Sequence, residues 1–399
     1  MTGILNETAL AAGLEPATAT SLYISAIAPV LVVFDRSHPD SGVGLPYWYL
    51  PNVDSPDRGV LRTMRRVGWL KHEAMRQQMH KPCITDLIGY LGFRLTNELT
   101  VNACSVAELS IRENGMLANL TDELLPPEPV ACISVIGQVS KSAREACGLP
   151  QRTHICAGGP DSLSAPLGIG ERQTYLQMIY LGTFGSLYQS STDLFDAASA
   201  AWLPDVPYHW RVSSPGFGGA IERMASSVAG PDQIRKLAVL DSLADSQPAG
   251  SEGCVMLLPL WDRAGITHGE HRLVSRDGRP VTRASIRCRA ALESLGIALN
   301  ALAVIDDGIV LRLAGGGTRS SIWQKILATV LGRPVVARAE HHLVPGTTAL
   351  AAAAFDVRLD EAEAFASQTI DPEDATSALL DALSYGESFY APLRDSAVL

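Results

Sequence analysis

Short β-rich segments alternate with longer amphipathic segments along this chain, and that alternation constrains the fold more than any other feature of the sequence. Residues 20–25 (TSLYIS) and 30–35 (VLVVFD) are β-rich, whereas residues 58–78 (RGVLRTMRRVGWLKHEAMRQQ) have the spacing of a helix. Such alternation favours an α/β architecture over an all-α or all-β one. With 399 residues, of which 47% are hydrophobic, the chain is long enough for two domains.

Charge and cysteine content exclude several classes of protein. The formal net charge is −10 and the 32 Lys and Arg form no basic run, which argues against a nucleic-acid partner. Residues 22–34 are apolar but are interrupted by Pro29 and are too short to span a bilayer, so we expect no signal peptide and no membrane anchor. Seven cysteines, without C-x-x-C spacing, indicate a reduced, cytoplasmic compartment.

Residues 309–332 (IVLRLAGGGTRSSIWQKILATVLG) predict a strand, a glycine turn and an amphipathic helix. A glycine turn before a helix exposes backbone amides to which a nucleotide can bind. A tight strand-to-helix connection explains the same glycines equally well, and the residues alone leave both interpretations open. The segment is not a P-loop, because no Gly-Lys pair follows, and the chain contains no G-x-G-x-x-G.

Residues 156–170 (CAGGPDSLSAPLGIG) place Asp161 between a glycine turn and a short helix. Aspartate is a preferred N-cap, because its carboxylate accepts hydrogen bonds from first-turn amides, and by itself the pattern favours that structural role. The same position can hold an ionised carboxylate that accepts the proton of a substrate hydroxyl during phosphoryl transfer.

Two further glycine-rich segments have the same ambiguity between turn and phosphate loop. Residues 175–191 (YLQMIYLGTFGSLYQSS) have two β-rich arms around GTFG, which predicts a hairpin, and a second domain is expected to begin there. Residues 213–224 (SSPGFGGAIERM) carry three glycines before a helix. His268 and His271 flank Glu270 in a predicted loop without the H-E-x-x-H order, so we expect a solvated loop and no resident metal site.

Taken in order, these motifs resemble the FGGY family of carbohydrate kinases, xylulose kinase in particular, from about residue 10 to residue 355. Residues 125–170, 180–188 and 313–336 carry most of the resemblance. It implies an α/β, two-domain, ribonuclease-H-like (actin-like ATPase) fold with an interdomain cleft in which sugar and ATP meet. The expected domains are 1–170, which binds the sugar, and 171–399, which binds the nucleotide.

The resemblance also implies roles for individual residues. Asp161 matches the family's catalytic aspartate, the base for the attacking sugar hydroxyl. The phosphate loop of the second domain corresponds to Gly182, Thr183 and Gly185. The turn that lines the adenosine pocket corresponds to Gly315, Gly316, Gly317 and Thr318. The implied cofactors are ATP and Mg²⁺, which bridges the phosphates.

This chain departs from the family pattern in its first half. The family's N-terminal hairpin, with its Asp-Gly-Thr type phosphate loop, has no match here, so we expect the first domain to be incomplete. Residues 25–29 read SAIAP where many members have Ser-Gly-Gln followed by polar residues. The sugar-binding residues implied by weaker matches are Asp54, Arg58 and Arg263.

The sequence therefore predicts an ATP-dependent kinase for a ketopentose or a related polyol. The alternative is a catalytically impaired remnant of the family, or a regulatory module that binds nucleotide without phosphorylating sugar. The expected partner is a small-molecule sugar, and a homo-oligomer is possible. Neither the sugar nor the oligomeric state follows from the sequence.

Overall fold

The computed structural model divides the chain into two compact units. It describes residues 21–28, 30–46, 60–108, 129–169, 176–190, 194–201, 203, 208–230, 233–261, 267–337, 343–357 and 368–395. Unit 1 comprises Met1–Arg172, Thr192–Pro207 and Leu343–Ala364, and unit 2 comprises Gln173–Ser191, Tyr208–His342 and Phe365–Leu399. We predicted one boundary at residue 170, whereas the structure returns two later segments to unit 1.

Unit 1 consists of short strands in small sheets with helices packed against them. Its elements are β1 (Ser21–Leu22), β2 (Ser25–Ala26), β3 (Val30–Asp35), β4 (His38–Pro46), α2 (Val60–Arg76), β5 (Pro82–Asp86), α3 (Leu87–Thr96), β6 (Val101–Asn102), α4 (Ala103–Glu108), β7 (Pro129–Val130), β8 (Val135–Gln138), α6 (Lys141–Cys147), β9 (His154–Cys156), β10 (Gly159–Pro160), α7 (Asp161–Leu167), α8 (Leu194–Ser199) and α13 (Leu343–Ala353). The sheet orders are β4-β3-β5, β1-β9-β8, β10-β2 and β6-β7.

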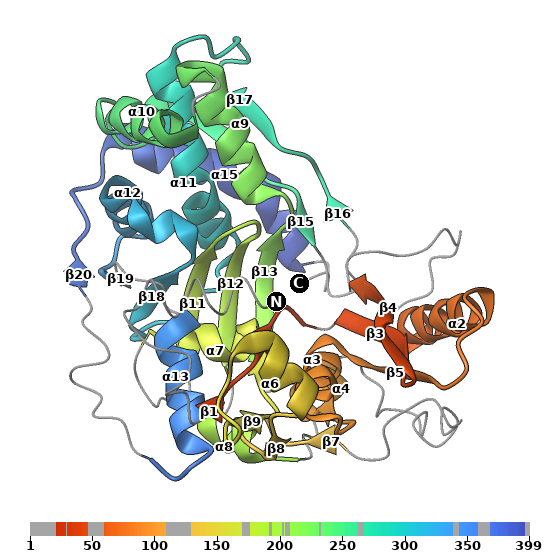
Figure 1. The fold of residues 1–399 in the computed structure, drawn as a ribbon. Coiled ribbons are helices and arrows are strands. Elements are labelled where there is room, and N and C mark those ends of the chain that lie inside the picture. The colour runs from red at the N-terminus through yellow and green to blue at the C-terminus, as the bar shows by residue number, and fades with distance from the viewer. Residues whose placement is uncertain are drawn as a thin grey trace. The chain divides into compact units, whose positions relative to one another are not determined.

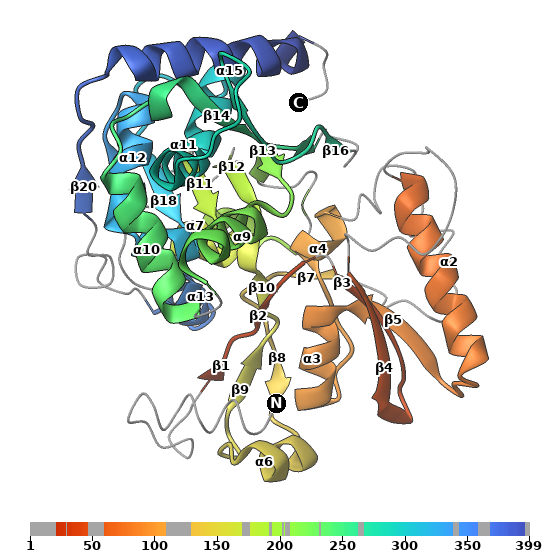
Figure 2. The same cartoon turned by 90° about the horizontal axis from the view of Figure 1, so that it is seen from above.

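The predicted helix at residues 58–78 is α2, which lies alongside the β4-β3-β5 sheet (Figure 2). Every residue of β3 is buried, as the apolar run VLVVFD predicts. The apolar face of α2, with Val67, Leu70 and Ala74, packs against this sheet and forms one core of unit 1. Burial of these aliphatic side chains is the main stabilising contribution at this end of the unit.

Unit 2 is built on one mixed sheet of six strands, with order β13-β12-β11-β18-β19-β20. Its elements are β11 (Leu176–Leu181), β12 (Gly185–Ser190), β13 (Tyr208–Ser214), α9 (Phe217–Ala229), α10 (Gln233–Asp245), the 3-10 helix η2 (Ser251–Gly253), β14 (Cys254–Leu257), β15 (Leu260–Trp261), β16 (Thr267–His268), β17 (Arg272–Ser275), α11 (Ala284–Leu302), β18 (Leu311–Ala314), the 3-10 helix η3 (Gly316–Arg319), α12 (Ser321–Leu331), β19 (Val335–Ala337), β20 (Gln368–Ile370) and α15 (Ser377–Asp395).

Helix α11 forms the centre of unit 2, because almost all of its side chains are buried. Helices α9, α10, α12 and α15 surround it beside the sheet (Figure 1). The predicted apolar face of α12 is also observed, with Ile326, Leu327 and Val330 in the same core. The predicted hairpin is confirmed, since β11 pairs antiparallel with β12 through a loop of residues 182–184.

One prediction about local structure is wrong. Residues 267–273 were expected to be a loop, but they include β16 and the start of β17, which pair with β15 and β14 respectively. The polar composition of this segment gives no strand signal, because the backbone pairing of its two strands does not require apolar side chains. Among the described residues, no helix is long and apolar enough to cross a membrane.

Candidate functional site

The three consecutive glycines after β18 do not share one structural reason. Gly315 has φ of 95°, and a Cβ there would lie 2.5 Å from the carbonyl oxygen of Leu181. A Cβ on Gly317 would lie 2.6 Å from the ring of Trp323. Nothing lies within 4 Å of a Cβ built on Gly316. The chain's own packing therefore requires two of the glycines, and Gly316 is the one that faces open space.

The hairpin loop between β11 and β12 lies against the first turn of α9. The amide of Gly218 donates to the carbonyl of Thr183 at 3.2 Å. A Cβ on Gly185 would lie 2.6 Å from the Phe217 ring, and one on Gly218 would lie 2.6 Å from the carbonyl oxygen of Gly182. Thr183, at the tip of the loop, is exposed. The loop is thus held rigidly while its hydroxyl residue faces solvent.

Three glycine segments therefore meet at the end of β11 within unit 2. The 315–317 turn rests on Leu181, the 182–185 loop follows it, and residues 216–219 begin α9. Gly216 is the N-cap of this 13-residue helix, with φ of 67°, and no side chain caps the first turn. Our predicted set lacked Gly216 and Gly218, although the GFGG pattern before a helix was the available signal.

Thr318 uses its hydroxyl inside the turn. The side chain is buried, and its Oγ1 donates to the carbonyl of Gly315 at 2.8 Å. The amide of Thr318 donates to the same carbonyl at 3.1 Å. Gln324 Nε2 donates to the carbonyl of Thr318 at 2.5 Å. Thr318 thus closes the glycine turn in this structure, and its contact with a nucleotide stays a prediction.

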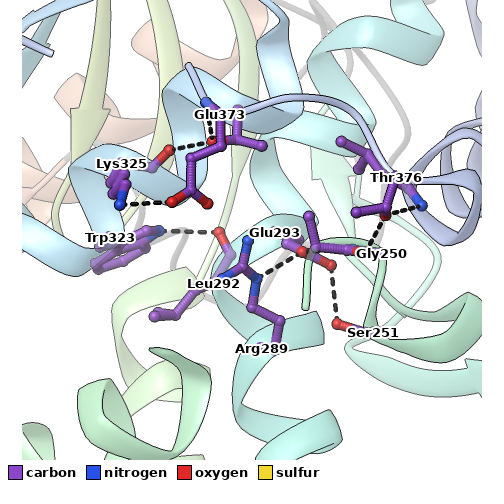
Figure 3. A network of polar contacts seen from close by, with 12 residues as sticks. Gly250, Ser251, Arg289, Leu292, Glu293, Trp323, Lys325, Glu373 and Thr376 are labelled. Carbon is purple, nitrogen blue, oxygen red and sulfur yellow. Dashed lines mark hydrogen bonds and ion pairs between the residues drawn. The ribbon is translucent and has the colours of Figure 1, made fainter. Parts of the chain in front are cut away.

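Trp323, whose ring lies against Gly317, belongs to a group of polar contacts between α11, α12 and neighbouring segments (Figure 3). Trp323 Nε1 donates to the carbonyl of Leu292 at 3.0 Å, which fixes the ring that covers Gly317. One turn away on α11, Arg289 Nε donates to Glu293 Oε1 at 2.7 Å, with both side chains buried.

The carboxylate of Glu293 also connects α11 to the segment before β14. It accepts hydrogen bonds from the amide of Gly250 at 2.9 Å and the hydroxyl of Ser251 at 2.8 Å. Burial raises the pKa of Glu293, and the hydrogen bonds from Arg289, Gly250 and Ser251 oppose that rise. Its paired donors satisfy a charge that would otherwise be costly to bury.

Asp161 lies in unit 1, at the first position of α7. The expectation that it is the N-cap is wrong: Pro160 occupies that position with extended backbone (φ −63°, ψ 153°), so no side chain caps the helix. Asp161 Oδ1 accepts a hydrogen bond from the amide of Ser162 at 2.9 Å. Burial raises the pKa of Asp161 to about 6, and hydrogen bonds to backbone amides only partly oppose that rise.

The backbone before Asp161 is held on both sides. Strand β10 pairs parallel with β2, with Pro160 opposite Ala26. Gly158 has φ of 86°, and its carbonyl accepts from Asn102 Nδ2 at 2.6 Å. The amide of Gly159 donates to the carbonyl of Ile24 at 2.9 Å. These bonds fix the backbone before Asp161 at the carboxyl end of β10, where catalytic groups of α/β folds commonly lie.

The predicted sugar contacts Asp54, Arg58 and Arg263 all lie outside the described residues. The structure brings together the predicted residues of the 182–185 loop and the 315–318 turn, all within unit 2. It places Asp161 in unit 1.

The arrangement in unit 2 fits an anionic, nucleotide-like ligand. The N-terminus of α9 and the exposed Thr183 are suited to phosphate, because a helix N-terminus attracts negative charge. The open position at Gly316 leaves room for a flat group to approach the backbone. In unit 1, a carboxylate with a pKa of about 6 is ionised at neutral pH and can accept a proton.

Sequence comparison identifies kinases among the relatives of this chain, although no protein-family model matches it. Autoinducer-2 kinase from Enterobacter sp. (strain 638) is 27% identical over 319 residues, which cover 69% of this chain and 57% of that protein. Xylulose kinase from Haemophilus influenzae is 24% identical over 228 residues, which cover 54% and 44% respectively. The chain thus matches less than two thirds of the length of these curated relatives.

Solved structures agree with this relationship. Ligand-bound xylulose kinase from Lactobacillus acidophilus has a TM-score of 0.70 at 16% identity, covering 99% of this chain and 87% of that one. Xylulose kinase from Rhodospirillum rubrum has a TM-score of 0.68 at 21% identity, with 98% and 87% covered. Plasmodium falciparum glycerol kinase with ADP has a TM-score of 0.66 at 14% identity, with 99% and 88% covered. The actin-like ATPase fold and the resemblance to FGGY carbohydrate kinases are thereby confirmed.

Proposed function

We propose that this chain is an ATP-dependent carbohydrate kinase that phosphorylates a hydroxyl of a ketopentose or a related polyol, with Asp161 as general base. The observation that carries the proposal is the Asp161 carboxylate itself. It directly follows β10 and is largely buried. Its pKa is raised to about 6, and the groups that shift this pKa include no cationic side chain. The resemblance to the FGGY family and the kinase relatives support the same chemistry.

In the proposed reaction, Asp161 accepts the proton of the acceptor hydroxyl while the hydroxyl oxygen bonds to the γ-phosphorus of ATP. The bond between that phosphorus and the β–γ bridging oxygen breaks, and ADP leaves. A base whose pKa lies just below the working pH is mostly ionised, yet still has a useful affinity for the proton. Fixing Gly158 and Gly159 through Asn102 and Ile24 holds the carboxylate in one position. Positioning of this kind matters because phosphoryl transfer depends little on covalent help from the protein.

In this proposal, unit 2 contains the nucleotide-binding site. The 182–185 loop and the first turn of α9 bind phosphate, while the open backbone at Gly316 lies against the adenosine. Magnesium, when bound with ATP, neutralises phosphate charge. A cytoplasmic location belongs to the same proposal, since all seven cysteines are free thiols, as in reducing compartments.

Release of ADP, coupled to an optical readout, tests the proposal across ketopentoses, ketohexoses and polyols. We expect acceptor-dependent ADP release from wild type and a loss of at least a hundredfold in Asp161→Asn. Asp196→Asn is the matched control, because Asp196 also lies in the first turn of a short helix of unit 1 but is exposed. A folded wild-type protein without acceptor-dependent turnover contradicts the proposal.

The second candidate function is a nucleotide-binding module without kinase activity. It is favoured by one observation: the three glycine segments belong to unit 2, so nucleotide binding does not require the residues around Asp161. Calorimetry with ATP and ADP separates the two functions. Nucleotide binding without turnover for any acceptor supports the module, and absence of nucleotide binding rejects both.

A further inference from the structure

Ile27 is an exposed aliphatic residue that directly follows β2, the strand paired with the one that ends before the proposed catalytic base. Ala26 pairs with Pro160 in the parallel β2–β10 ladder, so Ile27 and Asp161 are the residues that directly follow the two partners. Neighbouring parallel strands end at the same edge of a sheet, which places these two positions side by side. Ile27 is 40% exposed.

Among the described residues of unit 1, Ile27 lies outside the core cluster around β2. The core cluster around β2 contains Ile24, with Leu22 and Ala26 packed against it, but not Ile27. An aliphatic side chain at the edge of a proposed active site is suited to contact an apolar part of a ligand, because apolar surface gains from being covered.

The polar side chain of β2 that is nearest to Ile27 in sequence, Ser25, already makes a hydrogen bond within the protein. Ser25 Oγ donates to Ser164 Oγ at 3.1 Å, which ties β2 to α7. A substrate hydroxyl placed against Ile27 would lose water without gaining a hydrogen bond from that side chain.

We infer that the acceptor carries an apolar carbon, a deoxy or methyl carbon, where it contacts Ile27, so that Ile27 selects deoxy acceptors over fully hydroxylated ones. This inference rests on the proposed function for the identity of the site beside Asp161. A hydrophobic contact discriminates only moderately against an added hydroxyl, so the expected preference is roughly tenfold to a hundredfold.

Calorimetric titration tests the inference with pairs of acceptors that differ by one hydroxyl: a ketopentose and a pentitol, each with its monodeoxy counterparts. In wild type, we expect at least one deoxy compound to bind roughly tenfold more tightly than its parent. Ile27→Thr keeps the β-branched shape and adds a hydroxyl, so the Kd ratio should fall towards one. Ile27→Val keeps an apolar side chain and should retain the preference.

Val135→Thr is the matched control, because Val135 is 41% exposed on β8 of the same unit. It should leave every Kd ratio unchanged. Equal or tighter binding of the parent compounds to wild type overturns the inference, as does a preference that survives Ile27→Thr, or no binding of any compound.

ADP release measured on the same compounds keeps the two proposals apart. Deoxy preference in binding without turnover rejects the kinase function and leaves the acceptor preference standing. Turnover of parent and deoxy compounds at equal efficiency, with equal Kd values, rejects the preference and leaves the kinase function standing.

Discussion

The glycine turn of unit 2 and the Asp161 segment of unit 1 differ in how far contacts within the chain explain their residues. Around the turn, Gly315 and Gly317 contact Leu181 and Trp323 so closely that no Cβ fits. Around Asp161, a largely buried carboxylate has a raised pKa, and backbone amides only partly offset its desolvation.

This difference separates residues that internal packing explains from a residue that it does not. A motif whose members are all explained by internal packing needs no ligand to account for it. A buried charge whose desolvation is only partly offset is a cost that natural sequences keep mainly at active sites. The glycine motif is thus largely a scaffold with one open position, and the carboxylate is the stronger sign of chemistry.

The proposed role of Asp161 predicts that turnover depends on pH. Because the base must be ionised, kcat/KM should fall about tenfold for each pH unit below the pKa of Asp161, about 6, and level off above it. Initial rates between pH 5 and 8 measure this profile. If the rate did not change with pH while the protein stayed folded, Asp161 would not be the base. Its raised pKa would then no longer distinguish the Asp161 segment from the glycine turn.

Substitution of the packed glycines should lower stability strongly. Gly315→Ala adds a Cβ against Leu181 at positive φ, so we expect a loss of about 3 kcal/mol in the free energy of unfolding. Gly317→Ala should lose about 1–3 kcal/mol by crowding Trp323.

Gly316→Ala is the control within the same turn, because its Cβ meets nothing. It should change stability by less than about 0.5 kcal/mol and weaken ATP binding. Urea titrations and calorimetry check the three variants. Equal destabilisation by all three would mean that the turn is uniformly packed.

Asp161→Asn should stabilise the protein while removing its activity. Burial raises the pKa in the folded state from 3.8 to about 6, so the ionised carboxylate destabilises the fold. That destabilisation is absent below pH 3.8, grows as the pH rises towards 6, and is complete above it. The variant should therefore gain up to about 3 kcal/mol at pH 7.5 and almost nothing at pH 3.5. Unfolding curves at the two pH values measure the gain, and no gain at pH 7.5 would refute the raised pKa.

The smallest expected changes in the free energy of unfolding come from substitutions in the polar contacts around Trp323 and Lys325. Trp323→Phe loses the hydrogen bond to the Leu292 carbonyl and should cost about 1 kcal/mol. Glu373→Gln weakens the exposed ion pair with Lys325 and should cost less than about 0.5 kcal/mol. Thermal unfolding compares the two. A larger loss in Glu373→Gln would indicate that surface charge, and not the buried bond, supports the turn.

Local features of the fold were predictable because neighbouring residues determine them. The 182–184 hairpin follows from β-rich arms around glycine, and the end of α6 follows from Gly148, which is its left-handed C-cap. The return of α13 to unit 1 was not predictable, because it depends on Gly346 packing against the carbonyl of Ser164, far away in sequence.

Predictions about the site also succeeded where neighbouring residues determine the structure and failed where tertiary packing determines it. That glycines at 315–317 form a turn follows from the sequence, but Leu181 and Trp323 as their partners come only from tertiary packing. The misplaced cap at Asp161 has a local cause, since Pro160 has a fixed φ that suits the N-cap position and shifts the helix start by one residue.

The parallel pairing of β11 with β18 has a consequence for how the protein folds. The hairpin β11–β12 joins neighbouring residues, whereas Gln177 pairs with Leu311 across more than a hundred intervening residues. Contacts between residues so distant along the chain form slowly, because a long loop must first close. The glycine turn contacts Leu181 only after β18 has paired with β11. A nascent or partly refolded chain should therefore bind the proposed nucleotide only late in folding.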